Sequence, residues 1–332
     1  MKAMIVNEQG APDVLRLSEI ATPEPGPGEI RVDVSTAGVN FLDVQQRSGN
    51  YRMRTPFVAG NEGAGVVSAI GDGVTEVHVG DRVGWAMIAQ SGYAEQVVID
   101  ADRAIPLPDA IDDETAAAVL LQGLTAHYLT RSTYPVQPGD TVLVHAAAGG
   151  TGLLVTQMVR LAGGRVIGTA STREKAEIAR EAGAFEVLAS GTDDLVAKVR
   201  DLTAGHGVAA VYDGVGKDTF EASLKSLGRR GTLALYGSAS GPVPPFDLQR
   251  LARGSLSVAR PGLVDHIATR AELLWRAAEV FDWLEQGSLA VRVGGRYALA
   301  DAARAHEDLA GRRTTGKLVI AVRGPATSQL DR

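Results

Sequence analysis

The sequence predicts an α/β protein in two parts, a β-rich N-terminal part followed by a doubly wound parallel sheet. Short alternating apolar runs, separated by Gly- and Pro-rich turns, fill roughly the first 120 residues. From about Thr141 onward, apolar strand candidates alternate with helical patterns. These candidates recur at roughly 20- to 24-residue intervals, the spacing of consecutive βαβ units.

In the N-terminal part, the clearest strand patterns are IRVDVSTAGV from Ile30, AGVVSAI from Ala64 and YAEQVVI from Tyr93. Turn clusters such as PEPGPGE and GDG lie between them. Many short strands with frequent turns predict a β-barrel or sandwich. The opening residues MKAMIVNEQG have no apolar export segment, and we expect them to form a first strand.

The second part contains the strand candidates 142–145, 166–169, 186–188, 209–212, 232–236 and 256–259. Helical patterns include Arg173–Ala182 and Asp193–Thr203, and each leads into a glycine that can end a helix. After Pro261 the pattern predicts a long helix, a short helix over Asp301–Ala310 and a closing strand over Lys317–Val322. A doubly wound sheet binds its ligand at the carboxyl ends of its strands.

The composition is that of a globular protein with a small-molecule ligand. Hydrophobic residues make up 45% of the 332 residues and charged residues 22%. No apolar run reaches the roughly 18 residues that cross a bilayer, so we expect no membrane span and a cytoplasmic location. The chain has no cysteine, which excludes disulfides, thiolate catalysis and cysteine-ligated zinc. A net charge of -6 argues against a nucleic-acid partner.

The stretch VLVHAAAGGTGLL, from Val142 to Leu154, joins the first strand of this array to its first helix. Ala147, Gly149 and Gly152 fit the pattern G-x-G-x-x-G with alanine in the first place. Small residues let a pyrophosphate approach the backbone, and the helix N-terminus supplies N–H groups and a positive dipole end. The residues predicted to bind a dinucleotide here are Ala148, Gly149, Gly150, Thr151 and Gly152.

The end of the second strand predicts which dinucleotide is bound. A fold that prefers NAD usually has Asp or Glu at this place, to bind the ribose 2′-hydroxyl. Here Ser171, Thr172, Arg173 and Lys175 follow the strand, and hydroxyls and cations suit a 2′-phosphate. We therefore expect NADPH, bound by Ser171, Arg173 and Lys175. The structural alternative is a capped helix with solvated charges.

Several ordered motifs then resemble one family. They are VNFLDVQQRSG from Val39, AGNEGAGVV from Ala59, GDRV from Gly80, LQGLTAHYL from Leu121, HAAAGGTG from His145 and VYDGVG from Val211. Together they resemble the zinc-free, zeta-crystallin-like quinone oxidoreductases among the medium-chain dehydrogenases/reductases.

The resemblance implies a GroES-like substrate domain over 1–123 and a Rossmann NADPH-binding domain over 124–262. It also implies a C-terminal return over 263–322 that completes the first domain, and we expect a flexible tail over 323–332. Family members pair through their Rossmann domains, so the resemblance implies a homodimer.

The resemblance also bears on metal chemistry. Zinc-dependent relatives have a histidine ligand beside a glutamate at the place of Asn61, and their cysteine-rich lobe is absent here. An asparagine is a poor zinc ligand, so we expect no metal site. Without a Lewis acid, alcohol dehydrogenation is not expected. The remaining chemistry is hydride transfer to an acceptor that is already electrophilic.

By resemblance, Asn40 and Gln45 line the catalytic pocket. The Asn40 amide can donate a hydrogen bond to a developing oxyanion, and a turn residue after a strand is its structural alternative. Gln45 stands where close relatives have a tyrosine, and Ser190 stands where they have a tyrosine near the adenine. The resemblance places at the cofactor Asn40, Gln122, Thr125, Lys175, Ser190, Tyr236, Gly237, Arg260, Gly316 and Lys317.

The function implied is an NADPH-dependent reductase that transfers a hydride to a quinone without zinc. One alternative is the reduction of α,β-unsaturated ketones or enals, as by enoyl reductases of the same superfamily. Another alternative is a non-catalytic, crystallin-like protein that binds NADPH or RNA.

Overall fold

A computed structural model describes residues 1–323, and its chain forms two compact units. Unit 1 comprises Met1–Gln122, Ile267–Glu285 and the chain from Val291, and unit 2 comprises Gly123–His266 and Gln286–Ala290. The second boundary thus lies after His266 instead of residue 262, and residues 286–290 belong to unit 2. Of the expected tail over 323–332, residues 324–332 lie outside the described residues.

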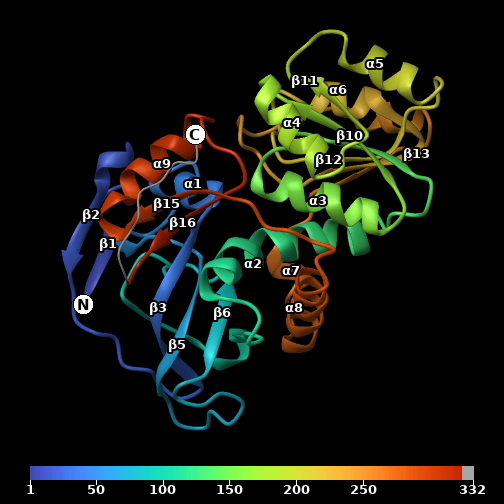
Figure 1. Ribbon diagram of the computed structural model, residues 1–332. Coiled ribbons are helices and arrows are strands. Elements are labelled where there is room, and N and C mark those ends of the chain that lie inside the picture. The colour runs from blue at the N-terminus through green and yellow to red at the C-terminus, as the bar shows by residue number, and fades with distance from the viewer. Residues whose placement is uncertain (324–332) are drawn as a thin grey trace. The chain divides into compact units, whose positions relative to one another are not determined.

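Unit 1 contains a seven-stranded sheet in the order β15-β16-β3-β5-β6-β8, with β7 paired to β3. Figure 1 labels its strands β3, β5, β6, β15 and β16. A second sheet has the order β2-β1-β4. The strands are β1 (Lys2–Val6), β2 (Leu15–Glu19), β3 (Glu29–Val39), β4 (Phe57–Val58), β5 (Glu62–Ile70), β6 (Arg82–Ala86), β7 (Gln96–Asp100), β8 (Ile105–Pro106), β15 (Val293–Ala298) and β16 (Lys317–Ala321).

Strand β3 organises unit 1. Its side chains alternate, and Ile30, Val32 and Val34 are fully buried in one core cluster. The C-terminal strand β16 pairs antiparallel with β3, where Leu318 lies opposite Val39, so the end of the chain completes the sheet formed by its beginning. The helices that lie wholly in unit 1 are α1 (Phe41–Ser48), α8 (Arg270–Glu285), α9 (Ala302–Ala310) and the short 3₁₀ helices η1 (Pro12–Val14), η2 (Ala101–Arg103) and η5 (Leu299–Asp301).

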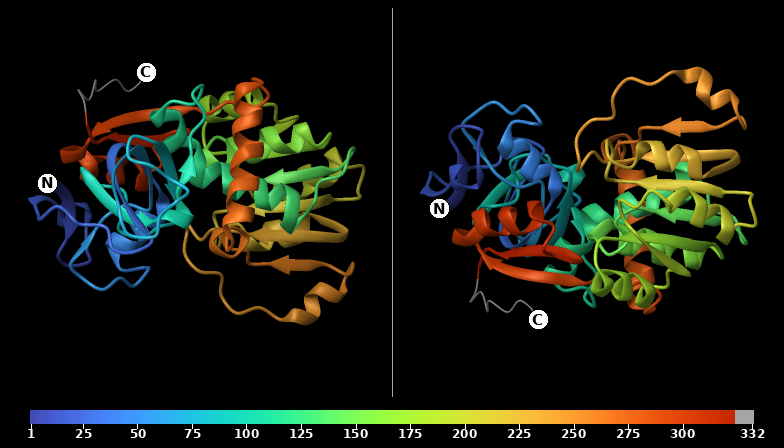
Figure 2. Two further views of the ribbon diagram at one scale, coloured as in Figure 1. Left: turned by 90° about the horizontal axis from the view of Figure 1, so that it is seen from below. Right: turned by 90° about the horizontal axis from the view of Figure 1, so that it is seen from above.

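Unit 2 is a parallel sheet in the order β11-β10-β9-β12-β13-β14, and Figure 2 shows helices packed along it. The strands are β9 (Thr141–Val144), β10 (Arg165–Ala170), β11 (Glu186–Ala189), β12 (Val208–Asp213), β13 (Leu227–Leu235) and β14 (Ser257–Ala259). The helices are α3 (Gly150–Leu161), α4 (Arg173–Glu181), α5 (Leu195–Leu202), α6 (Phe220–Ser226) and α7 (Leu263–His266), with the short π-helix η3 (Leu129–Thr133) and the 3₁₀ helix η4 (Leu248–Ala252).

The first strand of this sheet lies in its middle, and the strand order reverses between β9 and β12. In order of appearance this is the 3-2-1-4-5-6 arrangement of a Rossmann sheet. Side chains of α5 and α6 pack on one face with Leu143, Ile167 and Val211. The predicted fold class, a β domain plus a doubly wound parallel sheet, is confirmed.

Helix α2 (Asp113–Tyr128) contains the division between the two units, which falls after Gln122. The sequence patterns did not predict α1 or α2. Helices α3, α4, α5, α8 and α9 lie where a helix was expected, and α6 lies between two strand candidates that a helical pattern was expected to separate. Across residues 1–323, none of the helices combines the length and the hydropathy that crossing a membrane requires.

Candidate active site

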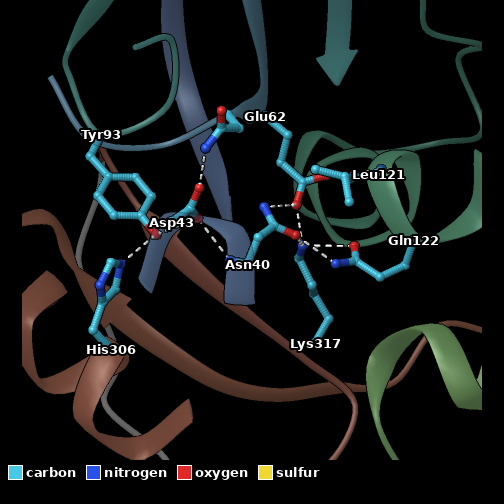
Figure 3. A network of polar contacts seen from close by, with 9 residues as sticks. Asn40, Asp43, Glu62, Tyr93, Leu121, Gln122, His306 and Lys317 are labelled. Atoms are coloured by element: carbon cyan, nitrogen blue, oxygen red, sulfur yellow. Dashed lines mark hydrogen bonds and ion pairs between the residues drawn. The ribbon is translucent and has the colours of Figure 1, made fainter. Parts of the chain in front are cut away.

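A cluster of buried polar side chains lies in unit 1, where β3 ends, β5 begins and α2 passes (Figure 3). Its members come from segments far apart in the sequence. We call this group the polar cluster, and it consists of Asn40, Asp43, Asn61, Glu62, Tyr93, Gln122, His306 and Lys317.

Asn40 lies at the centre of the polar cluster, between the end of β3 and the start of α1. Its side-chain oxygen Oδ1 accepts from Gln122 Nε2 at 2.6 Å and from Lys317 Nζ at 2.9 Å. Its Nδ2 donates to Glu62 Oε1 at 2.9 Å, and its backbone N–H donates to Asp43 Oδ2 at 2.8 Å. These bonds fix which way the Asn40 amide faces.

Glu62 and Lys317 form an ion pair inside unit 1, with side-chain exposures of 0% and 3%. The other Glu62 oxygen, Oε2, accepts from the backbone N–H of Leu121 at 2.9 Å. Burial lowers the pKa of Lys317, and the Glu62 carboxylate opposes that shift. Gly38 leaves room for this carboxylate, since a Cβ there would lie 2.5 Å from Glu62 Cδ and 2.6 Å from the Ala117 carbonyl oxygen.

A chain of hydrogen bonds leads from Asp43 to His306. The Tyr93 hydroxyl donates to Asp43 Oδ2 at 2.9 Å and lies 3.1 Å from His306 Nε2. Because that hydroxyl uses its hydrogen on Asp43, His306 Nε2 carries the proton of the imidazole. Burial raises the pKa of Asp43 to about 6, although donors from Asn61, Asn40 and Tyr93 lower it. Burial lowers the pKa of His306 to about 3.

Asn61 is held entirely by neighbouring side chains. Its Nδ2 donates to Asp43 Oδ1 and, at 2.7 Å, to Gln46 Oε1, and its Oδ1 accepts from Gln46 Nε2 at 3.3 Å. The Glu62 carboxylate next to it is occupied by Lys317. This donor set does not fit a zinc ion, because an amide and an ammonium stand where a metal site needs anionic or imidazole ligands. Nowhere within residues 1–323 do three or more His, Asp or Glu side chains gather as metal ligands.

In unit 2, the glycine-rich stretch forms a tight turn between β9 and α3. Ala146 has a positive φ of 50°, and a Cβ on Gly152 would lie 2.9 Å from the Cα of Ala147. Gly149 precedes α3 and has no side chain to cap the helix. The first-turn N–H groups of α3 can therefore bind an anion at the carboxyl end of the sheet.

The tip of β10 presents the residues predicted to bind a 2′-phosphate. Thr172 caps α4 by accepting from the Lys175 N–H at 3.2 Å, so the helix-capping alternative describes part of this segment correctly. The Arg173 side chain is 93% exposed and pairs with Glu177 at 3.2 Å. Ser171 is exposed at the end of the strand. Because an exposed ion pair contributes little, this pairing does not prevent Arg173 from turning to a phosphate.

Other predicted residues follow the neighbouring strands of unit 2. Ser190 lies directly after β11, and the backbone N–H groups of Tyr236 and Gly237, directly after β13, both donate to the Asp213 carbonyl at 2.9 and 3.3 Å. Arg260 donates to a backbone carbonyl at the end of β13 at 3.0 Å. These residues share the carboxyl edge of the sheet with the glycine turn.

The remaining predicted residues lie elsewhere. Gln45 is half-buried on α1, Gly316 precedes β16 with a φ of 62°, and Thr125 is buried in α2 on the unit 2 side of the division. The polar cluster thus unites Asn40, Gln122 and Lys317. All the assigned contacts to cofactor or substrate stay predictions.

Sequence reasoning missed two groups. Asp43, Tyr93 and His306 were not expected to meet, and no local signal links them. In unit 2, His145 Nε2 lies 2.9 Å from the Ser223 hydroxyl, which donates to Asp213 Oδ2 at 2.7 Å, and all three residues are buried. Asp213 follows a predicted strand in VYDGVG. Its position at the end of a strand was the one sequence signal that could have indicated a buried polar group here.

Known proteins resemble the chain over nearly its whole length. Residues 26–109 match the alcohol dehydrogenase GroES-like domain, and residues 150–277 match the family described as zinc-binding dehydrogenase. The quinone oxidoreductase of Pseudomonas aeruginosa is 45% identical over 94% of this chain and 96% of its own. The 2-haloacrylate reductase of a Burkholderia species is 39% identical over 96% of this chain and 98% of its own.

A solved mycobacterial structure in complex with NADPH has a TM-score of 0.94 and 51% identity, and the match covers 97% of this chain and all of that one. Both the sequence relatives and this fold match extend well beyond the glycine-rich turn of unit 2. The chain belongs to the medium-chain dehydrogenase/reductase family and, within it, to the quinone oxidoreductases.

Proposed function

We propose that this protein is an NADPH-dependent reductase that transfers a hydride to a quinone. The observation that carries the proposal is the glycine turn after β9, which opens onto the N-terminus of α3 beside the reversal of strand order. The quinone oxidoreductase names of the relatives and the NADPH complex of the mycobacterial structure support it.

The residues at the carboxyl edge of unit 2 fit this cofactor. The turn over 149–152 would hold the pyrophosphate, because its small residues leave the backbone open and a Cβ on Gly152 would collide with the turn. Ser171, Arg173 and Lys175 would hold the 2′-phosphate, since hydroxyls and a cation directly follow β10 and the first carboxylate, Glu174, comes only in the first turn of α4. When bound, the dihydronicotinamide supplies the hydride.

The polar cluster would serve the acceptor. Asn40 Nδ2 donates one hydrogen bond to Glu62, and Gln122 Nε2 donates one to Asn40. Within the described part of the chain, no acceptor has been identified for the second hydrogen of either amide. These hydrogens would donate to the oxygen on which negative charge develops as a quinone accepts a hydride.

A second candidate is the reduction of an activated alkene, which the similarity to the 2-haloacrylate reductase favours. Such a substrate also places developing negative charge on an oxygen conjugated to the reacting carbon. The same amide donors would therefore serve either acceptor.

The test is to follow NADPH and NADH oxidation with 1,4-benzoquinone and with methyl vinyl ketone. Lys175→Ala is expected to weaken NADPH binding by ~1.5–3 kcal/mol, a rise in Kd of roughly 10- to 150-fold, with little effect on NADH. Lys198→Ala is the control, because this exposed lysine on α5 pairs with Asp194 at 2.7 Å instead. Turnover confined to the enone would move the assignment to an alkene reductase. Failure to bind NADPH would refute the proposal.

We further propose that two copies pair through unit 2 and that the protein acts in the cytoplasm, where NADPH is supplied. β14 is the terminal strand of the unit 2 sheet, and an open edge of this kind can pair with a second chain. Sedimentation of the protein as a monomer at micromolar concentration would contradict the pairing.

A further inference from the structure

Lys317 is a buried cation at the start of β16, and its ammonium group touches three side chains of unit 1. We propose that Lys317 is a positioning residue for the reduction: it holds the amides of Asn40 and Gln122 with their oxygens inward, so that the second N–H of each amide is directed at the acceptor. The inference rests on the proposed function, because the acceptor is the one named there.

The orientation follows from the chemistry of the ammonium group. It has three N–H donors and no acceptor. Nζ bonds to Glu62 Oε1, to Asn40 Oδ1 at 2.9 Å and to Gln122 Oε1 at 2.7 Å, so all three donors are used (Figure 3). Flipping either amide would place an NH₂ group against the ammonium. Lys317 therefore excludes the flipped orientation of both amides.

Glu62 keeps this arrangement in place. Its Oε1 accepts from Lys317 and from Asn40 Nδ2, and its Oε2 accepts from the Leu121 N–H, one residue before Gln122 in α2. The carboxylate thereby ties both amide-bearing segments to one point. A buried ammonium group without such a partner would release its proton or move out toward solvent.

The same bonds argue against a purely local packing role. A side chain that only fills space needs volume and apolar contacts. Each N–H of the Lys317 ammonium group is instead directed at an amide oxygen or a carboxylate oxygen. A direct contact to the cofactor, which the resemblance implied for Lys317, would have to displace one of the three bonds. Lys317 acts on the substrate through Asn40 and Gln122.

The test uses the double variant Lys317→Met/Glu62→Gln, which removes both buried charges together and avoids a lone buried carboxylate. The control is Arg296→Met/Glu114→Gln, which removes another ion pair of unit 1, at 2.7 Å and about 37% exposed. Melting temperature and NADPH Kd are measured on all three proteins, followed by kcat and KM for 1,4-benzoquinone. Misplaced amides are expected to lower kcat on the order of 10²-fold, with the NADPH Kd within a factor of about three and the control near wild type.

A second readout does not depend on activity. Side-chain amide signals of Asn40 and Gln122 are recorded by ¹⁵N NMR and assigned with Asn40→Asp and Gln122→Glu. In the double variant both signals are expected to shift or split, as the amides sample two orientations, and in the control they are expected to remain. Unchanged amide signals, a wild-type kcat in the folded double variant, or a selective loss of NADPH binding would each overturn the inference. If the wild-type protein reduces no quinone, the proposed function fails, and the NMR result still decides the amide orientation.

Discussion

Replacing His306 by glutamine should change how the stability of the protein depends on pH. His306 is fully buried on α9, and its Nε2 donates to the Tyr93 hydroxyl at 3.1 Å, while Nδ1 has no hydrogen-bond partner in the described structure. Protonation of the ring would bury a positive charge near Arg47, which disfavours it further. A glutamine side chain can donate to the same hydroxyl and does not titrate.

The magnitude follows from the shift in pKa. The pKa of His306 is lowered from 6.5 to about 3 on folding. A folded-state pKa below the unfolded value means that the unfolded chain binds the proton first, so this stability is present above pH 6.5 and is lost as the pH falls. At pH 5.0, about 1.5 units below 6.5, the loss amounts to roughly 2 kcal/mol.

Asp43 acts in the opposite direction. Its pKa is raised from 3.8 to about 6, so its carboxyl group binds a proton more readily in the folded state, and its contribution to stability grows as the pH falls from 6 toward 3.8. A single curve for the wild-type protein therefore mixes the two effects. The difference between wild type and His306→Gln isolates the imidazole, because Asp43 is present in both proteins.

The assay is urea unfolding at pH 7.5 and pH 5.0 for wild type, His306→Gln and His206→Gln, which makes the same change at an exposed position. Relative to wild type, the His306 variant should gain about 2 kcal/mol of unfolding free energy between the two pH values. The unfolding free energy of the control His206→Gln, relative to wild type, should change little between the two pH values. A difference that stays constant across this range would refute the reasoning that a neutral, buried imidazole shapes the acid stability.

Two further changes test the buried polar groups. Gly38→Ala should displace the Glu62 carboxylate and lower the unfolding free energy, measured with urea, by ~1–3 kcal/mol. The control Gly262→Ala should lower it much less, because a Cβ there would meet only ordinary contacts. Equal losses of unfolding free energy in the two variants would contradict this prediction. Ser223→Ala removes bonds to a buried carboxylate and an imidazole and should cost ~1–3 kcal/mol. The control Ser226→Ala, on the same helix, removes one hydrogen bond to a backbone carbonyl and should lower the stability less, as measured by thermal unfolding. A larger loss in Ser226→Ala than in Ser223→Ala would contradict the role of the bonds that join Ser223 to His145 and Asp213.

Some helices were predictable from the sequence and others were not, for reasons of burial. Helix α4 has one buried face, with Ile178 and Ala179, and its polar remainder gives a clear 3.6-residue period. Helix α2 reads DETAAAVLLQGLTAHY and is buried along most of its length, so apolar residues occur on every side and no period appears. Helix α1 buries Asp43 and Arg47, which breaks the expected separation of polar and apolar faces.

The sequence by itself determined the two-part fold and the place of the glycine-rich turn, because both depend on residues close together in the chain. The period of the strands and helices is local, and so is the need for small residues between Ala147 and Gly152. Only the tertiary structure decided that Lys317 meets Glu62, Asn40 and Gln122. Lysine side chains are mostly exposed to solvent in folded proteins, so the sequence gives no reason to expect a buried ammonium group at this position. Its role here arises from antiparallel pairing of the last strand with the end of β3, a long-range contact that no local pattern encodes.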